Sequence, residues 1–159
     1  MKRILFVCLG NICRSPTAEA VFAHLAEKNK LRHLFEVDSA GIGDWHVGEP
    51  AHPRTREVAL RRGIVINHIA RQIRREDFER FDLIFGMDSG NVSALRRLAQ
   101  TPEEQAKIKR FRDFDPGASP LERDVPDPYY TGRFEEVFEI CERTAQSLLE
   151  YLVEQGIHR

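Results

Sequence analysis

The chain has 159 residues, 42% of them hydrophobic and 31% charged. That length fits one domain over residues 1–159, and the apolar share is enough for a packed core. Its 24 basic and 25 acidic residues give a net charge of −1, far from the basic balance of nucleic-acid-binding domains, so we expect no nucleic-acid partner. No apolar run approaches the ~18 residues that span a bilayer, and we expect no membrane association.

The three cysteines are Cys8, Cys13 and Cys141. They are too few, and odd in number, for a disulfide scaffold. Charged residues soon follow the short apolar stretch at residues 4–9, and no small-residue cleavage site follows it, which argues against a secretory signal. We therefore expect a location in the reducing cytoplasm.

The hydrophobic pattern begins with a strand, a turn and a helix. Residues 3–8 contain a continuous apolar run, which is typical of a strand buried on both faces of a parallel sheet. A turn containing Gly10 and Asn11 follows, and both residue types tolerate a left-handed backbone. Ser15 is then predicted to be a helix N-cap, with Pro16 at the first helical position.

Further strands and helices alternate along the rest of the chain. We expect strands at residues 34–40, 82–86 and 108–111, and helices at residues 55–63, 89–98 and 133–153. Residues 112–128 are rich in proline and are predicted to form a long loop, a kind of segment that is often functional. The alternation predicts an α/β fold, a three-layer sandwich in which helices flank a parallel sheet.

The strongest chemical signal is the Cys-x5-Arg loop after the first strand, which reads Cys-Leu-Gly-Asn-Ile-Cys-Arg-Ser over residues 8–15. Its position before a helix directs backbone N–H groups toward one anion site. The same field favours the reactive thiolate of Cys8. Arg14 can hold two phosphate oxygens at once, and Ser15 can donate to the sulfur. The pattern predicts phosphoryl transfer to a cysteine.

These motifs, in this order, resemble those of the low-molecular-weight protein tyrosine phosphatases over almost the full chain. In chain order they are Val7-Cys8-Leu9-Gly10-Asn11-Ile12-Cys13-Arg14-Ser15-Pro16, Ala18-Glu19, Ser39-Ala40-Gly41, Trp45, Val47-Gly48, His68, Ala70-Arg71-Gln72, Phe81-Asp82, Met87-Asp88, Asn91 and Asp127-Pro128-Tyr129-Tyr130. The resemblance implies a four-stranded parallel sheet with flanking helices. One departure is His52, where family members commonly carry Asp, which puts a surface turn contact in doubt.

The resemblance also implies a mechanism: Cys8 is the nucleophile, Arg14 clamps the phosphate, and Asp127 is the general acid and then the base. It implies no cofactor and no metal, and the sequence has no metal-binding pattern such as His-x3-His. Ser39 and His68 would support the loop, and Cys8 and Cys13 would be able to form a protective disulfide. The residues expected to bind phosphate or substrate are Leu9, Gly10, Asn11, Ile12, Cys13, Ser15, Trp45, Tyr129 and Tyr130.

The expected partners are a phosphotyrosine-containing protein as substrate and inorganic phosphate as product, with the chain a monomer or a weak homodimer. Arsenate reductases that share the loop need further redox cysteines, and none lies between Cys13 and Cys141. Protein-arginine phosphatases tend to place Thr at the position of Ile12 and lack the paired tyrosines. A non-catalytic phosphate-binding module would be free to lose Cys8 or Asp127, and this chain keeps both.

Overall fold

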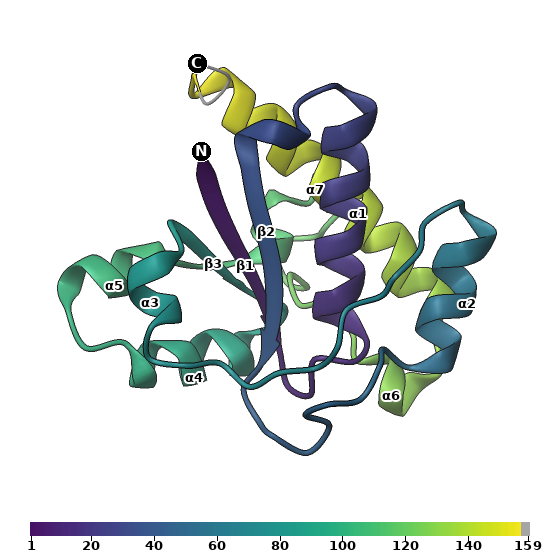
Figure 1. The fold of residues 1–159 in the computed structure, drawn as a ribbon, viewed down its shortest axis with the longest axis horizontal. Coiled ribbons are helices and arrows are strands. Elements are labelled where there is room, and N and C mark those ends of the chain that lie inside the picture. Colours follow the sequence, from purple (N-terminus) through teal and green to yellow (C-terminus); the bar gives the residue numbers. More distant parts are fainter. Residues whose placement is uncertain (157–159) are drawn as a thin grey trace.

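The computed structural model describes residues 1–156 and contains a four-stranded, all-parallel sheet in the order β2-β1-β3-β4 (Figure 1). The strands are β1 (Lys2–Cys8), β2 (Phe35–Gly41), β3 (Leu83–Gly86) and β4 (Ile108–Arg110). β1 pairs with β2 from Lys2 opposite Phe35 to Cys8 opposite Gly41. The predicted parallel sheet is confirmed, and each predicted strand lies within two residues of its observed bounds.

Strand β1 lies in the middle of the sheet and is buried on both faces. Ile4, Phe6 and Cys8 belong to one core cluster, and Leu5 and Val7 belong to the other. The five side chains are at most 3% exposed. Because successive side chains of a strand point to opposite faces, burial on both sides produces the continuous apolar run seen in the sequence.

Helices cover both faces of this sheet, as Figure 1 shows, with α1 and α7 on one side and α3, α4 and α5 on the other. The helices are α1 (Arg14–Lys28), α2 (Pro53–Arg61), α3 (Asp77–Arg80), α4 (Ser89–Leu98), α5 (Pro102–Lys107), α6 (Pro128–Thr131) and α7 (Phe134–Glu154), with 3₁₀ turns η1 (Arg32–Leu34) and η2 (Phe111–Phe114). Cys141 lies on the buried face of α7 and is part of the core. The three-layer α/β architecture is therefore confirmed.

The start of α1 differs from the prediction. The helix begins at Arg14 with Cys13 in the N-cap position, so the expected Ser15 cap is wrong. The hydroxyl of Ser15 is engaged elsewhere, 3.0 Å from the sulfur of Cys8 and 2.9 Å from the side-chain nitrogen of Asn11. The contact between the Ser15 hydroxyl and the Cys8 sulfur takes the place of a local capping hydrogen bond.

Helix α2 also begins earlier than expected, because His52 caps it. His52 Nδ1 accepts a hydrogen bond from the backbone N–H of Arg54 at 3.0 Å, and Pro53 takes the first helical position. Burial, together with the charges of Arg54 and Arg56, lowers the pKa of His52, so the ring stays neutral and can accept. His52 thus makes the turn contact for which an Asp is common in similar sequences. The short helices α3 and α5 were not predicted.

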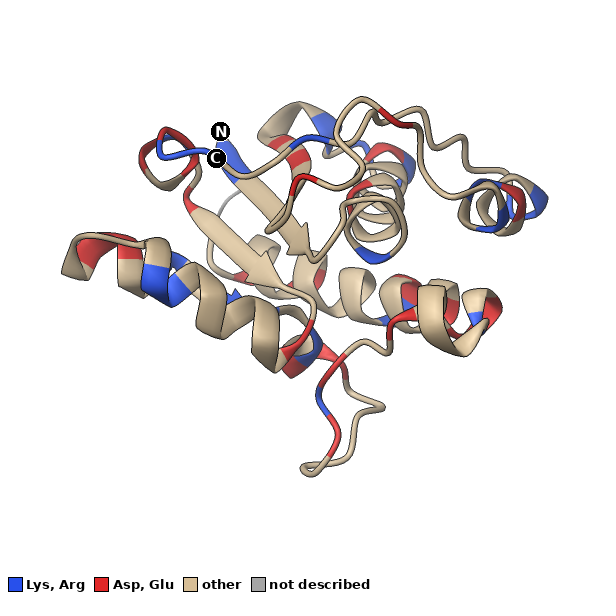
Figure 2. Ribbon diagram, turned by 90° about the horizontal axis from the view of Figure 1, so that it is seen from below, with Lys and Arg blue, Asp and Glu red and all other residues tan. Residues whose placement is uncertain are grey.

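Basic and acidic positions are interspersed over the elements visible in Figure 2, and neither sign gathers on one side. Within residues 1–156, no helix combines the length and the apolar character needed to cross a membrane.

The long loop after η2 is anchored to α7 by the buried carboxylate of Asp115. Its oxygens accept hydrogen bonds from Arg143 (2.6 and 2.9 Å), from Arg112 (2.9 Å) and from the N–H of Gly117 (2.8 Å). Burial alone would raise the pKa of Asp115, but these hydrogen bonds outweigh it and hold the pKa at about 2. The loop therefore leaves the sheet from a fixed point.

We expect Asp115→Asn to lower the free energy of unfolding by about 2 kcal/mol at neutral pH, because charge-assisted hydrogen bonds are lost. The folded pKa of about 2 lies below the ordinary 3.8, so the carboxylate stabilises the fold above pH 3.8. That contribution disappears as the pH falls through about 2. Urea unfolding of both proteins, from neutral pH down into acid, measures both effects.

Asp113→Asn is the matched control, because Asp113 pairs with Arg110 at the surface and a change there costs at most about 0.5 kcal/mol. Equal losses in the Asp113 and Asp115 variants would contradict the anchoring role of Asp115.

Candidate active site

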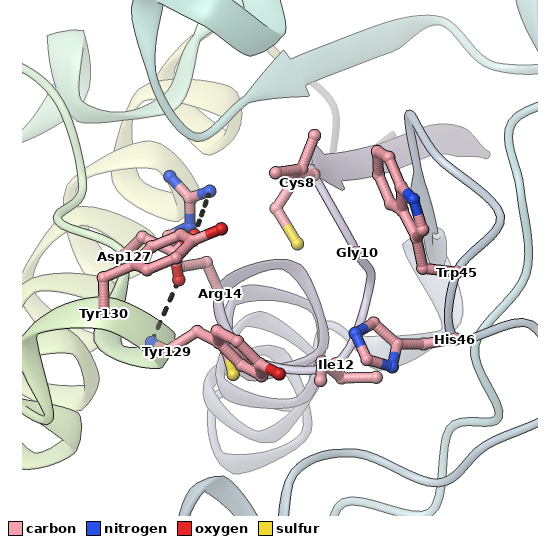
Figure 3. Close-up of a pocket in the computed structure, with 11 residues that line it drawn as sticks. Cys8, Gly10, Ile12, Arg14, Trp45, His46, Asp127, Tyr129 and Tyr130 are labelled. Atoms are coloured by element: carbon pink, nitrogen blue, oxygen red, sulfur yellow. Dashed lines mark hydrogen bonds and ion pairs between the residues drawn. The ribbon is translucent and has the colours of Figure 1, made fainter.

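A cavity of about 350 Å³ opens where β1 meets the N-terminus of α1, at the carboxyl end of the sheet. Figure 3 shows its lining side chains pointing toward a common space. The lining residues are Cys8, Leu9, Gly10, Ile12, Cys13, Arg14, Trp45, His46, Asp127, Tyr129 and Tyr130. The structure therefore brings together residues from three separate segments of the chain, 8–14, 45–46 and 127–130.

The sulfur of Cys8 receives hydrogen bonds from inside its own loop. The backbone N–H of Asn11 donates to it at 3.3 Å, and the hydroxyl of Ser15 lies 3.0 Å away. Cys8 is only 3% exposed and ends the central strand, so its position is fixed by the sheet. Donors arranged in this way stabilise a thiolate.

Asn11 connects this loop to the segments behind it. Its backbone is left-handed, with φ of 59°, a conformation that Asn adopts more readily than most residues. Its side-chain nitrogen donates to Ser15 (2.9 Å) and Ser39 (3.0 Å), and its oxygen bonds to His68 Nε2 (2.8 Å) and to the N–H of Arg71 (2.9 Å). The residues expected to support the loop therefore meet on one buried amide.

Of the two residues that tolerate a left-handed backbone, Asn11 adopts it and Gly10 does not. A Cβ at Gly10 would lie 3.0 Å from Cδ2 of His46. A Cβ at Gly41, at the end of β2, would lie 3.1 Å from the backbone oxygen of Leu9 and from Cβ of Asn11. A side chain at either position would crowd these neighbouring atoms, so glycine is favoured at both. The sequence alone does not reveal such close approaches.

Arg14 is 2% exposed and pairs with two carboxylates. Its Nη1 donates to Asp88 (2.6 Å) and to the carbonyl of Val125 (3.1 Å), and its Nη2 donates to Asp127 (3.3 Å). Burial alone would lower the pKa of Arg14, but Cys8, Asp88 and Asp127 together raise it, so the guanidinium stays charged. Among the described residues its Nε has no hydrogen-bond partner, which leaves a donor for a phosphate oxygen.

Asp127 stands at the start of α6, where its Oδ1 accepts a hydrogen bond from the N–H of Tyr129 at 3.1 Å. Its side chain is 23% exposed and faces the same cavity as Cys8 (Figure 3). The long loop anchored by Asp115 carries this carboxylate to the cavity.

The outer part of the cavity is aromatic. Trp45, Tyr129 and Tyr130 are between 55% and 77% exposed, and the two tyrosine rings lie 5.5 Å apart in an edge-to-face arrangement. The His46 ring is 6.1 Å from that of Tyr129. These rings are able to hold a flat, apolar group above the anion cradle.

Sequence reasoning missed two contributors, His46 and Asp88. His46 lines the cavity next to Trp45, and its only sequence signal is that adjacency. Asp88 belongs to a motif that similar sequences share. It lies 74 positions from Arg14, so no short sequence pattern indicates that the two side chains form an ion pair. Only the parallel packing of β1 beside β3 places the two in contact.

The other two thiols differ from Cys8 in their surroundings. Burial raises the pKa of Cys13 and of Cys141 to about 12, so both remain protonated at neutral pH. All three cysteines are free thiols in the structure.

Comparison with known proteins identifies the family. A family model described as "Low molecular weight phosphotyrosine protein phosphatase" matches residues 3–157. A low molecular weight protein-tyrosine-phosphatase of Streptomyces coelicolor is 49% identical over 155 residues, 96% of this chain and 94% of that protein. The crystal structure of YfkJ from Bacillus subtilis has a TM-score of 0.92 at 44% identity and covers 98% of this chain and 96% of its own.

A further solved structure, a Drosophila arginine phosphatase, has a TM-score of 0.87 at 34% identity and covers 96% of this chain and 98% of its own. The fold is thus shared by enzymes with two named substrate classes. The match of the family model over nearly the whole length, with relatives at 40–49% identity, decides the assignment. The chain belongs to the low molecular weight phosphotyrosine protein phosphatase family.

Proposed function

We propose that this phosphatase hydrolyses phosphotyrosine in proteins through a phosphocysteine intermediate on Cys8. The observation that carries the proposal is the convergence of Cys8, Arg14 and Asp127 on one cavity with aromatic walls. A thiolate nucleophile, a fixed guanidinium and a carboxylic acid are the three groups that cleavage of an aryl phosphate requires.

In the first step the Cys8 thiolate attacks phosphorus, and Asp127 gives its proton to the departing tyrosyl oxygen. The loop N–H groups and Arg14 hold the equatorial oxygens throughout, which stabilises the transition state without reorganisation. The incoming phosphate replaces Asp127 as the partner of Arg14 Nη2, and the carboxyl group then turns to the leaving oxygen.

In the second step Asp127 removes a proton from water, which attacks the phosphocysteine and releases inorganic phosphate. The sulfur departs as a thiolate, and the hydroxyl of Ser15, 3.0 Å away, stabilises the negative charge that forms on it. The cycle returns every group to its starting state.

The aryl preference rests on the rim of the cavity. Trp45, Tyr129 and Tyr130 offer ring surface that a phenyl phosphate uses and that a guanidinium phosphate uses less. Ile12 lines the cavity where protein-arginine phosphatases tend to carry Thr. Because the nucleophile must remain a free thiol, we also propose that the protein works in the reducing cytoplasm.

Initial rates with an aryl phosphate in EDTA test the mechanism. Cys8→Ser is expected to abolish turnover, because a hydroxyl does not ionise at neutral pH. Asp127→Ala is expected to reduce kcat by about 10²–10⁴-fold, the usual contribution of a general acid.

Asp124→Asn, in the same loop but hydrogen-bonded to Ser89, serves as the control and keeps the wild-type rate. Turnover that survives Cys8→Ser would refute the phosphocysteine route.

The aromatic rim is tested by Tyr129→Ala and Tyr130→Ala. Each is expected to lower kcat/KM for an aryl phosphate, mainly by raising KM, by about 2- to 13-fold, which corresponds to the ~0.5–1.5 kcal/mol of an aromatic contact. Tyr151→Ala, which removes a tyrosine on α7 packed against Phe114, is the control.

A mixture of phosphotyrosine and phosphoarginine peptides, sampled with time, compares the two substrate classes directly. Faster loss of phosphoarginine, unaffected by the tyrosine substitutions, would assign the site to arginine phosphatase activity instead.

A further inference from the structure

Tyr129, one wall of the cavity, stands on the short helix α6, which gives it little support. The helix has four residues, Pro128–Thr131, and Tyr129 is 55% exposed. Figure 3 shows its side chain at the cavity, near that of His46, whose ring centroid is 6.1 Å away. A large ring on one turn of exposed helix can change rotamer, and a substrate that binds the ring then loses affinity to the entropy of ordering it. A contact that fixes the ring in advance would remove that loss.

The side chain of His52 makes such a contact. Its ring meets the Tyr129 ring edge-to-face, with the centroids 6.3 Å apart and the ring planes at 86°. Aromatic rings prefer this arrangement, in which the edge of one ring faces the π-surface of the other. His52 is not one of the residues that line the cavity in the described part of the chain. It therefore contacts the aromatic wall outside the space that a substrate would fill.

The His52 ring is itself held on two sides. Its Nδ1 accepts the hydrogen bond from the N–H of Arg54 at 3.0 Å. Its face packs on Phe134, with the centroids 4.8 Å apart and the planes at 30°. Phe134 is the first residue of α7 and is only 8% exposed. Because a hydrogen bond and a buried neighbour both restrain it, the imidazole has one orientation and can support another ring.

The backbone of His52 is bonded to the phosphate-binding loop. Its N–H donates to the carbonyl of Ile12 at 2.8 Å, and Ile12 is one of the loop residues that line the cavity. One residue therefore contacts the loop through its main chain and the aromatic wall through its side chain. The spacing between phosphate and ring is nearly constant in an aryl phosphate. A wall held at a fixed position relative to the loop suits that rigid ligand.

Capping of α2 does not by itself account for a histidine at this position. Helices favour Asn, Asp, Ser and Thr at the N-cap, because a small side-chain acceptor is all that the cap requires. His52 supplies the acceptor and adds a ring, and that ring packs against Tyr129 and Phe134. The contacts that an ordinary capping residue would lack are the ones that reach the aromatic wall.

We propose that His52 is a positioning residue that holds the aromatic wall at a fixed place above the phosphate-binding loop and so increases selectivity for aryl phosphates. The inference rests on the proposed function, because it takes Tyr129 as a contact of the substrate ring. His52 acts through Tyr129, and through it on Tyr130, whose ring lies 5.5 Å from that of Tyr129. It therefore affects ligands that carry a ring and leaves the binding of inorganic phosphate unchanged.

Steady-state kinetics of His52→Asn and His52→Ser test the proposal. Both substitutions remove the ring and keep an acceptor for the N–H of Arg54, so α2 remains capped, and thermal melts confirm that each variant folds. We expect KM for an aryl phosphate to rise at least about 2-fold, but by no more than in Tyr129→Ala, with kcat unchanged. The inhibition constant of inorganic phosphate, which has no ring, is expected to keep its wild-type value in both variants.

A double substitution shows whether His52 acts through Tyr129. In Tyr129→Ala protein, His52→Asn is expected to raise KM no further, because the ring that His52 positions is already gone. His33→Asn, which removes an exposed imidazole in η1, is the control and keeps the wild-type KM.

Three results would overturn the proposal. They are a wild-type KM in both His52 variants, an equal rise in the inhibition constant of inorganic phosphate, and additive effects of the His52 and Tyr129 substitutions. Failure of the proposed function would be seen separately, as turnover that survives Cys8→Ser.

Discussion

The side-chain amide of Asn11 is the contact on which the rest of the catalytic site depends. Its backbone is left-handed, which costs energy for a residue other than glycine, and hydrogen bonds to Ser15, Ser39, His68 and Arg71 hold it there. That geometry points the N–H of Asn11 at the Cys8 sulfur. One buried amide therefore joins the loop of the proposed nucleophile, Cys8, to β2, to the segment after α2 and to the start of α1.

The sheet supplies the second constraint, since it brings the remaining groups to one edge. β1 ends at Cys8, and β3 ends just before Asp88, so parallel pairing brings Asp88 beside Arg14. The loop anchored by Asp115 then carries Asp127 to the same place. Groups from widely separated parts of the chain meet because parallel strands all end on the same side.

The sequence was most informative where function depends on local order. The apolar run of β1, the Cys-x5-Arg spacing and the turn before α1 lie within adjacent residues, so pattern reasoning could identify the phosphate cradle. The prediction for Ser15 was wrong. A serine before a proline is typical of a helix N-cap, whereas the Ser15 hydroxyl contacts the sulfur of Cys8. The sequence contains no sign of the contacts that Asp88 and His46 make, since only the fold brings them near Arg14 and Gly10.

The contacts among Glu19, Asp38 and His68 were not predicted for the same reason. These three side chains come from α1, β2 and the segment after α2, and only the fold brings them together. Short helices such as α3 and α5 were also missed, because four to six residues hold too little periodicity to stand out.

The ion pair between Arg14 and Asp127 has a consequence for phosphate affinity. In the free protein the Asp127 carboxylate already binds Arg14, so a phosphate that enters the cavity must displace that carboxylate. Inorganic phosphate replaces the carboxylate through its charge alone. A phosphate attached to an aromatic ring also gains contact with Trp45, Tyr129 and Tyr130. The Asp127 carboxylate thus weakens the binding of every phosphate alike, and only a ligand that also contacts the aromatic rings recovers the affinity that this exchange costs.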